Sequence, residues 1–362
     1  MSYLQDLKAV ISINSHTYNK NGVDKVGDKI AKWFTKLGFS HKVFTRELIG
    51  HHHLFSSPKT EGKKLLLLGH IDTVFPKGTF ESYSEDEHWV YGPGVCDMKG
   101  GIVVAHEALK SLPKIENIDI LLVSDEETGS DDSKHLTSKL ATNYDYCFVF
   151  EAAGEIGEVV SGRKGVGTFN IHIQGKAAHA GNHYIKGHDA NLEAAIKLQK
   201  LVALTNLDKG TTLNVGKIDG GIGANTISPK SSLLFEIRYT QIDEKERLLN
   251  AIDEIVSTSY VNGTISTLSG GIQRDVMEES EDTLNFIKSL ENISNTSIPY
   301  ERRGGVSDAN IVSSAGVLTL DGFGPFGDGD HTVDERASKQ SFKERIELTS
   351  KLLHHFIINK SF

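Results

Sequence analysis

Residues able to bind metal follow three short apolar runs in the first half of the chain. His70 comes after residues 65–68, Glu126 and Glu127 come after residues 118–123, and Glu151 comes directly after residues 147–150. Parallel strands of an open α/β sheet end on the same side, and the functional crevice lies outside those carboxyl ends. Imidazole and carboxylate groups are ligands that zinc accepts. The spacing therefore predicts a metal site where the three strands end.

Two further candidates lie in glycine-rich turns. Asp97 stands in residues 92–101, a loop that opens a helix, and His331 stands in residues 327–332. Counting one of the two adjacent glutamates, the set holds two imidazoles and three carboxylates, which suits two zinc ions if one carboxylate bridges them. Three carboxylates leave about one positive charge on two divalent cations, and a bridging hydroxide would neutralise it. That metal-bound hydroxide is the expected nucleophile, because zinc lowers the pKa of its bound water to about 7.

The adjacent pair Glu126 and Glu127 can divide two roles. Successive side chains at a strand end point in opposite directions, so one glutamate can bind metal while the other does not. The second carboxylate can act as the general base that takes a proton from water and hands it to the leaving amine. Asp72, two residues after His70, has the reach to accept the second imidazole N–H and fix its tautomer.

Each motif taken alone is more often structural than catalytic. An acidic run such as residues 125–127 is usually a solvated loop, and His70 by itself could be a buried core histidine. Ligand types at three strand ends together favour a metal site. The sequence also has no competing motif, since it contains neither a phosphate-binding P-loop nor a Gly-x-Ser-x-Gly elbow. The run His51–His53 alternates faces in an extended segment and is expected on the surface. Cys96, beside Asp97, is expected to serve packing.

The elements that must position these residues alternate between strands and helices. Apolar residues recur at helical spacing from Val26 to Leu37, and Gly38 stands where a C-cap glycine would. A second helical stretch, residues 101–112, lies between the first two apolar runs. This alternation predicts an α/β fold with a doubly wound, mostly parallel sheet.

A different pattern begins near Gly165. Residues 169–173 and 233–239 alternate apolar and polar side chains, as in strands with one exposed face. Helical stretches at about residues 191–204 and 244–257 accompany them. Residues 165–273 are therefore expected to form an inserted α+β domain of β-α-β-β-α-β order.

The first pattern returns after the insertion. A helix is expected from about Leu284, a strand at residues 317–320 and a closing helix at residues 342–357. The predicted domains are therefore a catalytic domain, residues 1–164 with 274–362, and the inserted domain, residues 165–273.

Composition excludes several classes of partner. The chain has 362 residues and a net charge of −9 at pH 7, so nothing draws it to nucleic acid or to an anionic membrane. No stretch approaches the ~18 consecutive apolar residues of a membrane span, and charged residues interrupt the N-terminal segment where a signal would be apolar. Two cysteines are too few for a disulfide-stapled scaffold. We expect a cytoplasmic protein.

Several motifs together carry a family resemblance. They are residues 69–76, 92–101, 125–129, 175–181, 224–229, 236–239 and 304–309. With these motifs the chain resembles, over nearly its whole length, the dinuclear zinc peptidases and deacylases that include carboxypeptidase G, acetylornithine deacetylase, succinyl-diaminopimelate desuccinylase and aminoacylase. It resembles the carboxypeptidase G group most.

The resemblance implies a role for each candidate in the first domain. One zinc would be held by His70 and Glu151, the other by Glu127 and His331, with Asp97 bridging them and Glu126 as the base. The peptide bond between Asp97 and Met98 is expected to be cis.

The resemblance also implies that the inserted domain is a lid and dimerisation domain. His179 and Asn225 would approach the scissile carbonyl, His179 from this subunit or from its partner. Donors of this kind stabilise a tetrahedral oxyanion by ~3–4 kcal/mol each. Arg238 would hold the terminal carboxylate of the substrate through a bidentate pair, and Gly305 would belong to the substrate-binding surface.

The function implied is hydrolysis of an amide bond next to a free carboxylate, as in a carboxypeptidase of the G type. An N-acyl-amino-acid deacylase or a dipeptidase is the alternative, so the expected substrate is a dipeptide or an N-acyl amino acid. The expected cofactor is zinc, two per subunit, with cobalt or manganese as substitutes; the expected assembly is a homodimer. A catalytically silent, metal-stabilised amino-acid-binding module would require a missing ligand or base, and none is missing.

Overall fold

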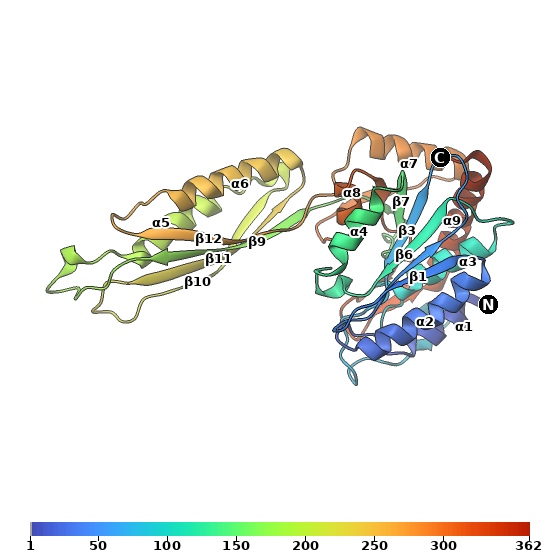
Figure 1. Ribbon diagram of the computed structural model, residues 1–362, viewed down its shortest axis with the longest axis horizontal. Coiled ribbons are helices and arrows are strands. Elements are labelled where there is room, and N and C mark those ends of the chain that lie inside the picture. The colour runs from blue at the N-terminus through green and yellow to red at the C-terminus, as the bar shows by residue number, and fades with distance from the viewer. Residues whose placement is uncertain (1) are drawn as a thin grey trace. The chain divides into compact units, whose positions relative to one another are not determined.

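The chain divides into two compact units, each with its own hydrophobic core. A computed structural model describes residues 2–362. Unit 1 comprises residues 2–163 and 279–362, and unit 2 comprises Lys164–Glu278 (Figure 1). These junctions lie within a few residues of the ones expected for an insertion at residues 165–273.

Unit 1 is built on a six-stranded sheet of order β1-β2-β6-β3-β7-β14. Its strands are β1 Ser40–Phe44, β2 His52–Ser56, β3 Leu65–His70, β6 Ile118–Val123, β7 Tyr146–Val149 and β14 Leu318–Leu320. The neighbours β6, β3, β7 and β14 are parallel, and β1 and β2 are antiparallel additions at one edge. Every residue of β3 and β6 is buried, as expected for parallel strands covered on both faces. The predicted doubly wound, mostly parallel α/β sheet is confirmed.

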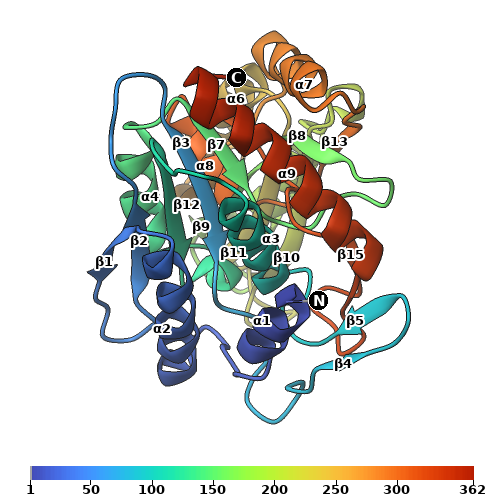
Figure 2. The same cartoon turned by 90° about the vertical axis from the view of Figure 1, so that its right-hand side faces the viewer.

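Two groups of helices cover this sheet. In one group α3 Lys99–Lys110 and α9 Lys339–Asn359 pack together, with α1 Ser2–Ile11 on α3 and α7 Glu281–Ser294 on α9; in the other, α4 Ser133–Ala141 packs on α8 Asp308–Ser314. Figure 2 shows α3 and α9 in front of the sheet and α4 and α8 behind it. None of the helices within residues 2–362 combines the length and the apolar character needed to cross a bilayer.

The helix expected from Val26 to Leu37 is α2 Lys20–Lys36, which packs against β1 and β2. It begins earlier than expected because Val23 is also buried on its apolar face. Gly38 follows it with a φ of 91°, the left-handed conformation expected of a glycine after a helix end.

Short strands outside the main sheet tie loops of unit 1 together. β5 Trp89–Tyr91 pairs with β4 Ser84–Glu85 and with β16 Arg336–Ser338, which also pairs with β15 Gly327–Asp328. β8 Val159–Arg163 pairs with β13 Tyr300–Arg303. The β5–β16 pairing places the loop that contains Asp97 beside the segment that follows His331.

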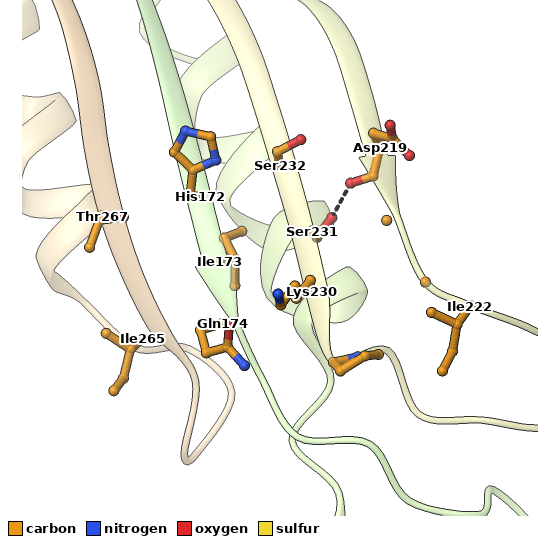
Figure 3. Close-up of a pocket in the computed structure, with 13 residues that line it drawn as sticks. His172, Ile173, Gln174, Asp219, Ile222, Lys230, Ser231, Ser232, Ile265 and Thr267 are labelled. Carbon is orange, nitrogen blue, oxygen red and sulfur yellow. Dashed lines mark hydrogen bonds between the residues drawn. The ribbon is translucent and has the colours of Figure 1, made fainter.

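Unit 2 is an antiparallel sheet of order β10-β11-β9-β12. Its elements follow the chain as β9 Gly165–Gln174, α5 Ala190–Val202, β10 Thr212–Gly220, β11 Lys230–Tyr239, α6 Ile242–Ser257 and β12 Ile265–Arg274, with 3₁₀ turns at Tyr184–Lys186 and Leu207–Lys209. This is the predicted β-α-β-β-α-β order. Buried and exposed residues alternate along β9 and β11, because α5 and α6 cover one face of the sheet (Figure 1). The opposite face has a hollow of about 600 Å³ bordered by His172, Asp219 and Lys230 (Figure 3).

The histidine run corrects one interpretation of the sequence. His52 and His53 are 0% and 2% exposed and lie in β2, so the run is not a surface decoration. The reason is that β2 pairs with β1 on one side and β6 on the other, and is an interior strand. His52 Nε2 lies 2.9 Å from Asp132 Oδ1, and His53 Nδ1 lies 2.9 Å from His41 Nε2. The imidazoles are therefore part of the packing and polar pairing of the sheet.

The two cysteines, Cys96 and Cys147, are free thiols and are buried. Burial raises the pKa of both thiols well above their usual range, which keeps them protonated and unreactive at neutral pH. The packing role expected of Cys96 is confirmed.

Candidate metal centre

Three of the candidate ligands lie at the carboxyl ends of neighbouring strands. His70 is the last residue of β3, Glu127 lies in the 3₁₀ turn Glu126–Thr128 after β6, and Glu151 follows β7. Because β6, β3 and β7 are adjacent and parallel, their ends bring the three side chains to the same place.

Two loops supply the remaining candidates. Asp97 precedes α3, and the peptide bond Asp97–Met98 is cis, as expected from the resemblance. His331 lies between β15 and β16 and has a φ of 63°. The pairing of β16 with β5 holds these two loops side by side, although they are far apart in the sequence.

Asp97 occupies the middle of the resulting cluster. Its Oδ1 lies 3.0 Å from His70 Nε2, and its Oδ2 lies 3.2 Å from His331 Nε2. His331 Nε2 also lies 3.1 Å from Glu127 Oε2, and His70 Nε2 lies 3.7 Å from Glu151 Oε1. The five side chains thus form two groups, His70 with Glu151 and His331 with Glu127, which share Asp97.

The electrostatics of the cluster favour added positive charge. Burial and the negative charge of Asp97 raise the pKa of Glu127 to about 8 and that of Glu151 well above its usual range. Hydrogen bonds to Asp97 and Glu127 raise the pKa of His331 to about 11. Burial alone would lower the pKa of His70, but hydrogen bonds to neighbouring carboxylates raise it well above its usual range. The cluster therefore holds protons that bound cations would replace.

The donor set fits a pair of divalent cations. Ligand atoms of His70, Asp97 and Glu127 all lie within 4.8 Å of one another. Imidazole and carboxylate are the ligand types of zinc, and cobalt or manganese accept them as well. The two oxygens of Asp97 face different histidines, which is the arrangement that a bridging carboxylate requires.

Asp72 connects two of the candidate ligands. His70 Nδ1 lies 3.1 Å from the main-chain oxygen of Asp72 and 3.3 Å from its Oδ1, so both oxygens are within reach of the imidazole N–H. The other carboxylate oxygen, Oδ2, accepts the N–H of Glu127 at 3.2 Å and the hydroxyl of Thr17 at 2.7 Å. Asp72 can therefore fix the tautomer of His70 and also the turn that carries Glu127.

Glu126 lines a pocket of about 280 Å³ beside this cluster. Other residues of the lining are Asp97, Glu151, Arg303, Gly305 and His331. The pocket gives Glu126 an open space next to the candidate ligands. Gly305 accepts a hydrogen bond from Arg163 Nη1 through its main-chain oxygen at 3.0 Å, which holds the loop at the pocket.

Arg303 was not among the residues singled out from the sequence. Its Nε donates to Glu301 Oε1 at 2.8 Å, and its Nη1 donates to the main-chain oxygen of Ala152 at 2.9 Å. Its position directly before the motif of residues 304–309 was the signal available in the sequence.

The remaining candidates, His179, Asn225 and Arg238, belong to unit 2. The structure brings the first two together, because the N–H of Ala180 donates to the main-chain oxygen of Asn225 at 2.9 Å. Both side chains are exposed. His179 Nδ1 accepts hydrogen bonds from two backbone N–H groups at 3.2 Å, so the proton of the neutral ring lies on Nε2 and can be donated.

Arg238 lies on β11 and is half-buried. Its Nε and Nη2 donate to the two carboxylate oxygens of Glu236, at 2.7 and 3.4 Å. The guanidinium therefore already presents the two-pronged geometry that binds a carboxylate.

Two other features of the molecule are weaker candidates. Between α1 and α3, Asp6 Oδ2 and Glu107 Oε1 lie 3.7 and 4.0 Å from His106 Nδ1, but Lys110 Nζ lies 2.8 Å from that same Glu107 oxygen and already supplies a positive charge. The hollow on unit 2 is larger than the pocket at Glu126, but its lining gathers no comparable set of ligands (Figure 3).

Comparisons with known proteins concern the family and the fold of the chain. The family description "Peptidase family M20/M25/M40" matches residues 66–355. Carboxypeptidase G2 of Pseudomonas sp. (strain RS-16) is 27% identical over 264 residues, which cover 69% of this chain and 63% of that protein, just under two thirds of its length. Acetylornithine deacetylase of Vibrio atlanticus (strain LGP32) is 30% identical over 259 residues, which cover 66% of this chain and 68% of that protein.

A solved structure shows the same fold over almost the whole chain. The aminopeptidase PepT from Bacillus cereus ATCC 10987 has a TM-score of 0.83 with 21% sequence identity, and the match covers 98% of both chains. At this identity the likeness concerns the fold.

Proposed function

The chain belongs to peptidase family M20/M25/M40, and from this membership we propose that it is a dinuclear zinc hydrolase that cleaves an amide bond next to a free carboxylate. The first candidate activity is that of a carboxypeptidase of the G type, because a carboxypeptidase G2 is among the relatives. The second is that of an N-acyl-amino-acid deacylase, favoured by the match to an acetylornithine deacetylase, or of a dipeptidase. The substrate would be a small molecule, a dipeptide or an N-acyl amino acid.

The position of Asp97 between His70 and His331 is the observation that carries this proposal. His70 and Glu151 would hold one cation, His331 and Glu127 would hold the other, and Asp97 would bind both. When bound, the two cations would polarise the scissile carbonyl and activate a water molecule at neutral pH.

Glu126 is the residue that we propose moves the proton. It lines the pocket beside Asp97, Glu151 and His331, and its neighbour Glu127 is the candidate ligand whose Oε2 lies 3.1 Å from His331 Nε2. A carboxylate in this position can take a proton from the attacking water and then deliver it to the amine as the amide bond breaks.

Unit 2 would act as the lid and the dimerisation domain. The Nε2–H of His179 and the side-chain amide of Asn225 are donors that can stabilise the oxyanion of the tetrahedral intermediate. Arg238 would bind the terminal carboxylate of the substrate in place of Glu236, and Gly305 would line the substrate site from unit 1. Sizing of the protein in solution tests the homodimer, which a monomer at all concentrations would contradict.

The two buried, free cysteines suit a reducing compartment, and we place the protein in the cytoplasm. Fractionation of cells that express the untagged chain tests this location.

A substrate screen at full zinc occupancy tests the activity. The screen should span dipeptides, folyl-type glutamates and N-acetyl amino acids, and we expect turnover in one of these classes. Turnover of N-acyl amino acids alone would select the deacylase. Calorimetric binding of amino acids without any product from the screen would instead favour a catalytically silent binding module.

A further inference from the structure

Glu335 is a buried carboxylate that the proposed chemistry does not use. It is 1% exposed and lies directly before β16, in the segment that follows His331. Its side chain points away from solvent into the loop that carries Asp97. A buried carboxylate is costly unless hydrogen bonds satisfy it, so its partners indicate what it is for.

The partners are three backbone N–H groups of a single loop. Glu335 Oε2 accepts the N–H of Gly94 at 2.9 Å, and Oε1 accepts the N–H groups of Cys96 and Asp97 at 3.1 and 3.2 Å. The thiol of Cys96 adds a weaker contact to Oε1 at 3.4 Å. These three hydrogen bonds, donated to the two oxygens of one buried side chain, strongly restrict the loop.

A backbone ladder aligns the same two segments. Arg336 on β16 is paired with Tyr91 on β5, and the N–H of Gly92 donates to the main-chain oxygen of Glu335 at 3.2 Å. The backbone pairing of β16 with β5 ends at this point, and the hydrogen bonds to the Glu335 carboxylate connect the two segments further, as far as Asp97. The loop needs unusual backbone angles to reach it, since Gly92 and Gly94 have φ of 149° and 85°.

The consequence concerns the two oxygens of Asp97. They must face His70 and His331 at the same time, and the direction of a short side chain is determined by the backbone that carries it. Glu335 binds the N–H of Asp97 itself and stands four residues after His331. One side chain thus couples the position of the shared carboxylate to that of the second histidine.

We propose that Glu335 is a positioning residue that orients Asp97, so that this one carboxylate can bind both cations. The inference rests on the proposed function, because it assigns Glu335 a role toward the cation pair that Asp97 would bridge. Groups that orient metal ligands in this way typically contribute a factor of ~10–100 to metal affinity.

The test is zinc binding by calorimetry, with a competing chelator, to the full-length wild type and to Glu335→Gln. The amide has nearly the same shape, but it loses the charge and turns an NH₂ toward backbone N–H groups. We expect affinity for Zn²⁺ to fall by ~10–100-fold. Hydrogen exchange of the metal-free protein should become faster at the amides of residues 94, 96 and 97.

Glu193 in unit 2 provides a matched control. It is 0% exposed, and its Oε2 accepts the backbone N–H groups of Tyr260 and Val261 at 3.0 and 2.6 Å. Glu193→Gln should lower the unfolding temperature of the metal-free protein and leave the affinity for Zn²⁺ unchanged. This control separates a general loss of stability from a specific effect on the cation site.

The outcomes distinguish the two proposals. Zinc affinity of Glu335→Gln equal to that of the wild type would overturn the positioning role, whereas a wild type that binds fewer than two Zn²⁺ would overturn the proposed function instead. If Glu335→Gln does not fold, Glu335→Asp decides, because the shorter acid keeps the charge but cannot reach all three amides. Wild-type affinity in Glu335→Asp would then overturn the inference, and a fall of similar size would support it.

Discussion

His331 Nε2 lies 3.2 Å from Asp97 Oδ2, although the two residues are far apart in the sequence. The contact forms because β16 pairs with β5, which brings the segment after His331 to the loop that contains Asp97. Asp97 thereby gains a second histidine in addition to His70. This relationship divides the five candidate ligands into two groups that share one carboxylate.

Asp97→Asn is expected to abolish the shared site. The amide offers a single acceptor oxygen and no charge, so it cannot bind two cations. Zinc content after dialysis should fall from two per chain to one or none, and kcat/KM should fall by more than ~100-fold. The control is Asp334→Asn, at an exposed position of the loop that carries His331, and it should keep the zinc content and the kcat/KM of the wild type. Two zinc ions bound to Asp97→Asn would contradict the assignment.

Glu126→Gln is expected to remove the general base without removing metal. Because the amide cannot take up a proton, kcat should fall by ~10²–10⁴-fold. Zinc content should remain that of the wild type, since Glu127, whose Oε2 lies 3.1 Å from His331 Nε2, is the proposed ligand and is unchanged. Glu155→Gln, at an exposed position near Glu151, should retain full activity. Wild-type turnover by Glu126→Gln would show that another group moves the proton.

Arg238→Ala is expected to weaken binding of the substrate carboxylate. Loss of a charge-assisted pair worth about 1.5–3 kcal/mol corresponds to a rise in KM of ~10–100-fold. The effect should vanish for substrates whose carboxylate is capped as an amide. Arg247→Ala provides the control, because Arg247 pairs with Glu244 within α6. Equal losses with capped and uncapped substrates would assign Arg238 a structural role.

Removal of metal is expected to destabilise the protein. Without cations, three carboxyl groups lie close together in the site, those of Asp97, Glu127 and Glu151. A cation that binds only the folded state stabilises the folded protein. At a zinc concentration ~1,000 times Kd the gain is about 4 kcal/mol. The unfolding temperature should fall when a chelator is added and recover with Zn²⁺. Asp97→Asn should respond much less, and a full response of that variant would place the stabilising cation elsewhere.

His53 is expected to make stability depend on pH. Burial and the neighbouring histidines lower its pKa to about 4, against ~6.5 in the unfolded chain. Below pH ~6.5 His53 takes up a proton in the unfolded chain but stays neutral in the folded protein. The contribution of His53 to the free energy of unfolding therefore has its full value above pH ~6.5 and decreases as the pH falls toward about 4. The loss from this one group amounts to about 3 kcal/mol.

Urea unfolding at about pH 7 and about pH 5 measures this effect. The free energy of unfolding should fall less between the two pH values in His53→Phe than in the wild type. Phe55→Leu, which alters a neighbouring buried ring, should lower the free energy of unfolding by the same amount at both pH values. An unchanged pH dependence in His53→Phe would assign the acid sensitivity to other groups.

The sequence was sufficient to predict the main elements because local patterns dictate them. The apolar runs that become β3, β6 and β7 are nearly continuous, with Asp119 as the one polar residue in the β6 run, as is typical of parallel strands buried on both faces. The alternation along β9 and β11 likewise follows from one covered and one open face. The ligand types at the strand ends could be read for the same reason, since parallel neighbours end together.

Interior polar groups could not be predicted in this way. His52 and His53 looked like surface residues because nothing local shows that β2 has a partner on each side. Glu335 had no local signal either, because its three partners lie in a loop that is distant in the sequence. Whether such a side chain is buried depends on which segments of the chain pair with its own.

The sequence by itself therefore determined the chemistry that is available, two histidines and several acids placed after buried strands and in glycine turns. Tertiary structure decided which of them meet: that Asp97 stands between His70 and His331, that Asp72 supports both His70 and Glu127, and that Glu335 binds the loop of Asp97. The physical reason is that hydrogen bonds and charges act over a few ångströms of space. Distance along the chain does not determine that separation, which depends on how the strands pair and the loops close.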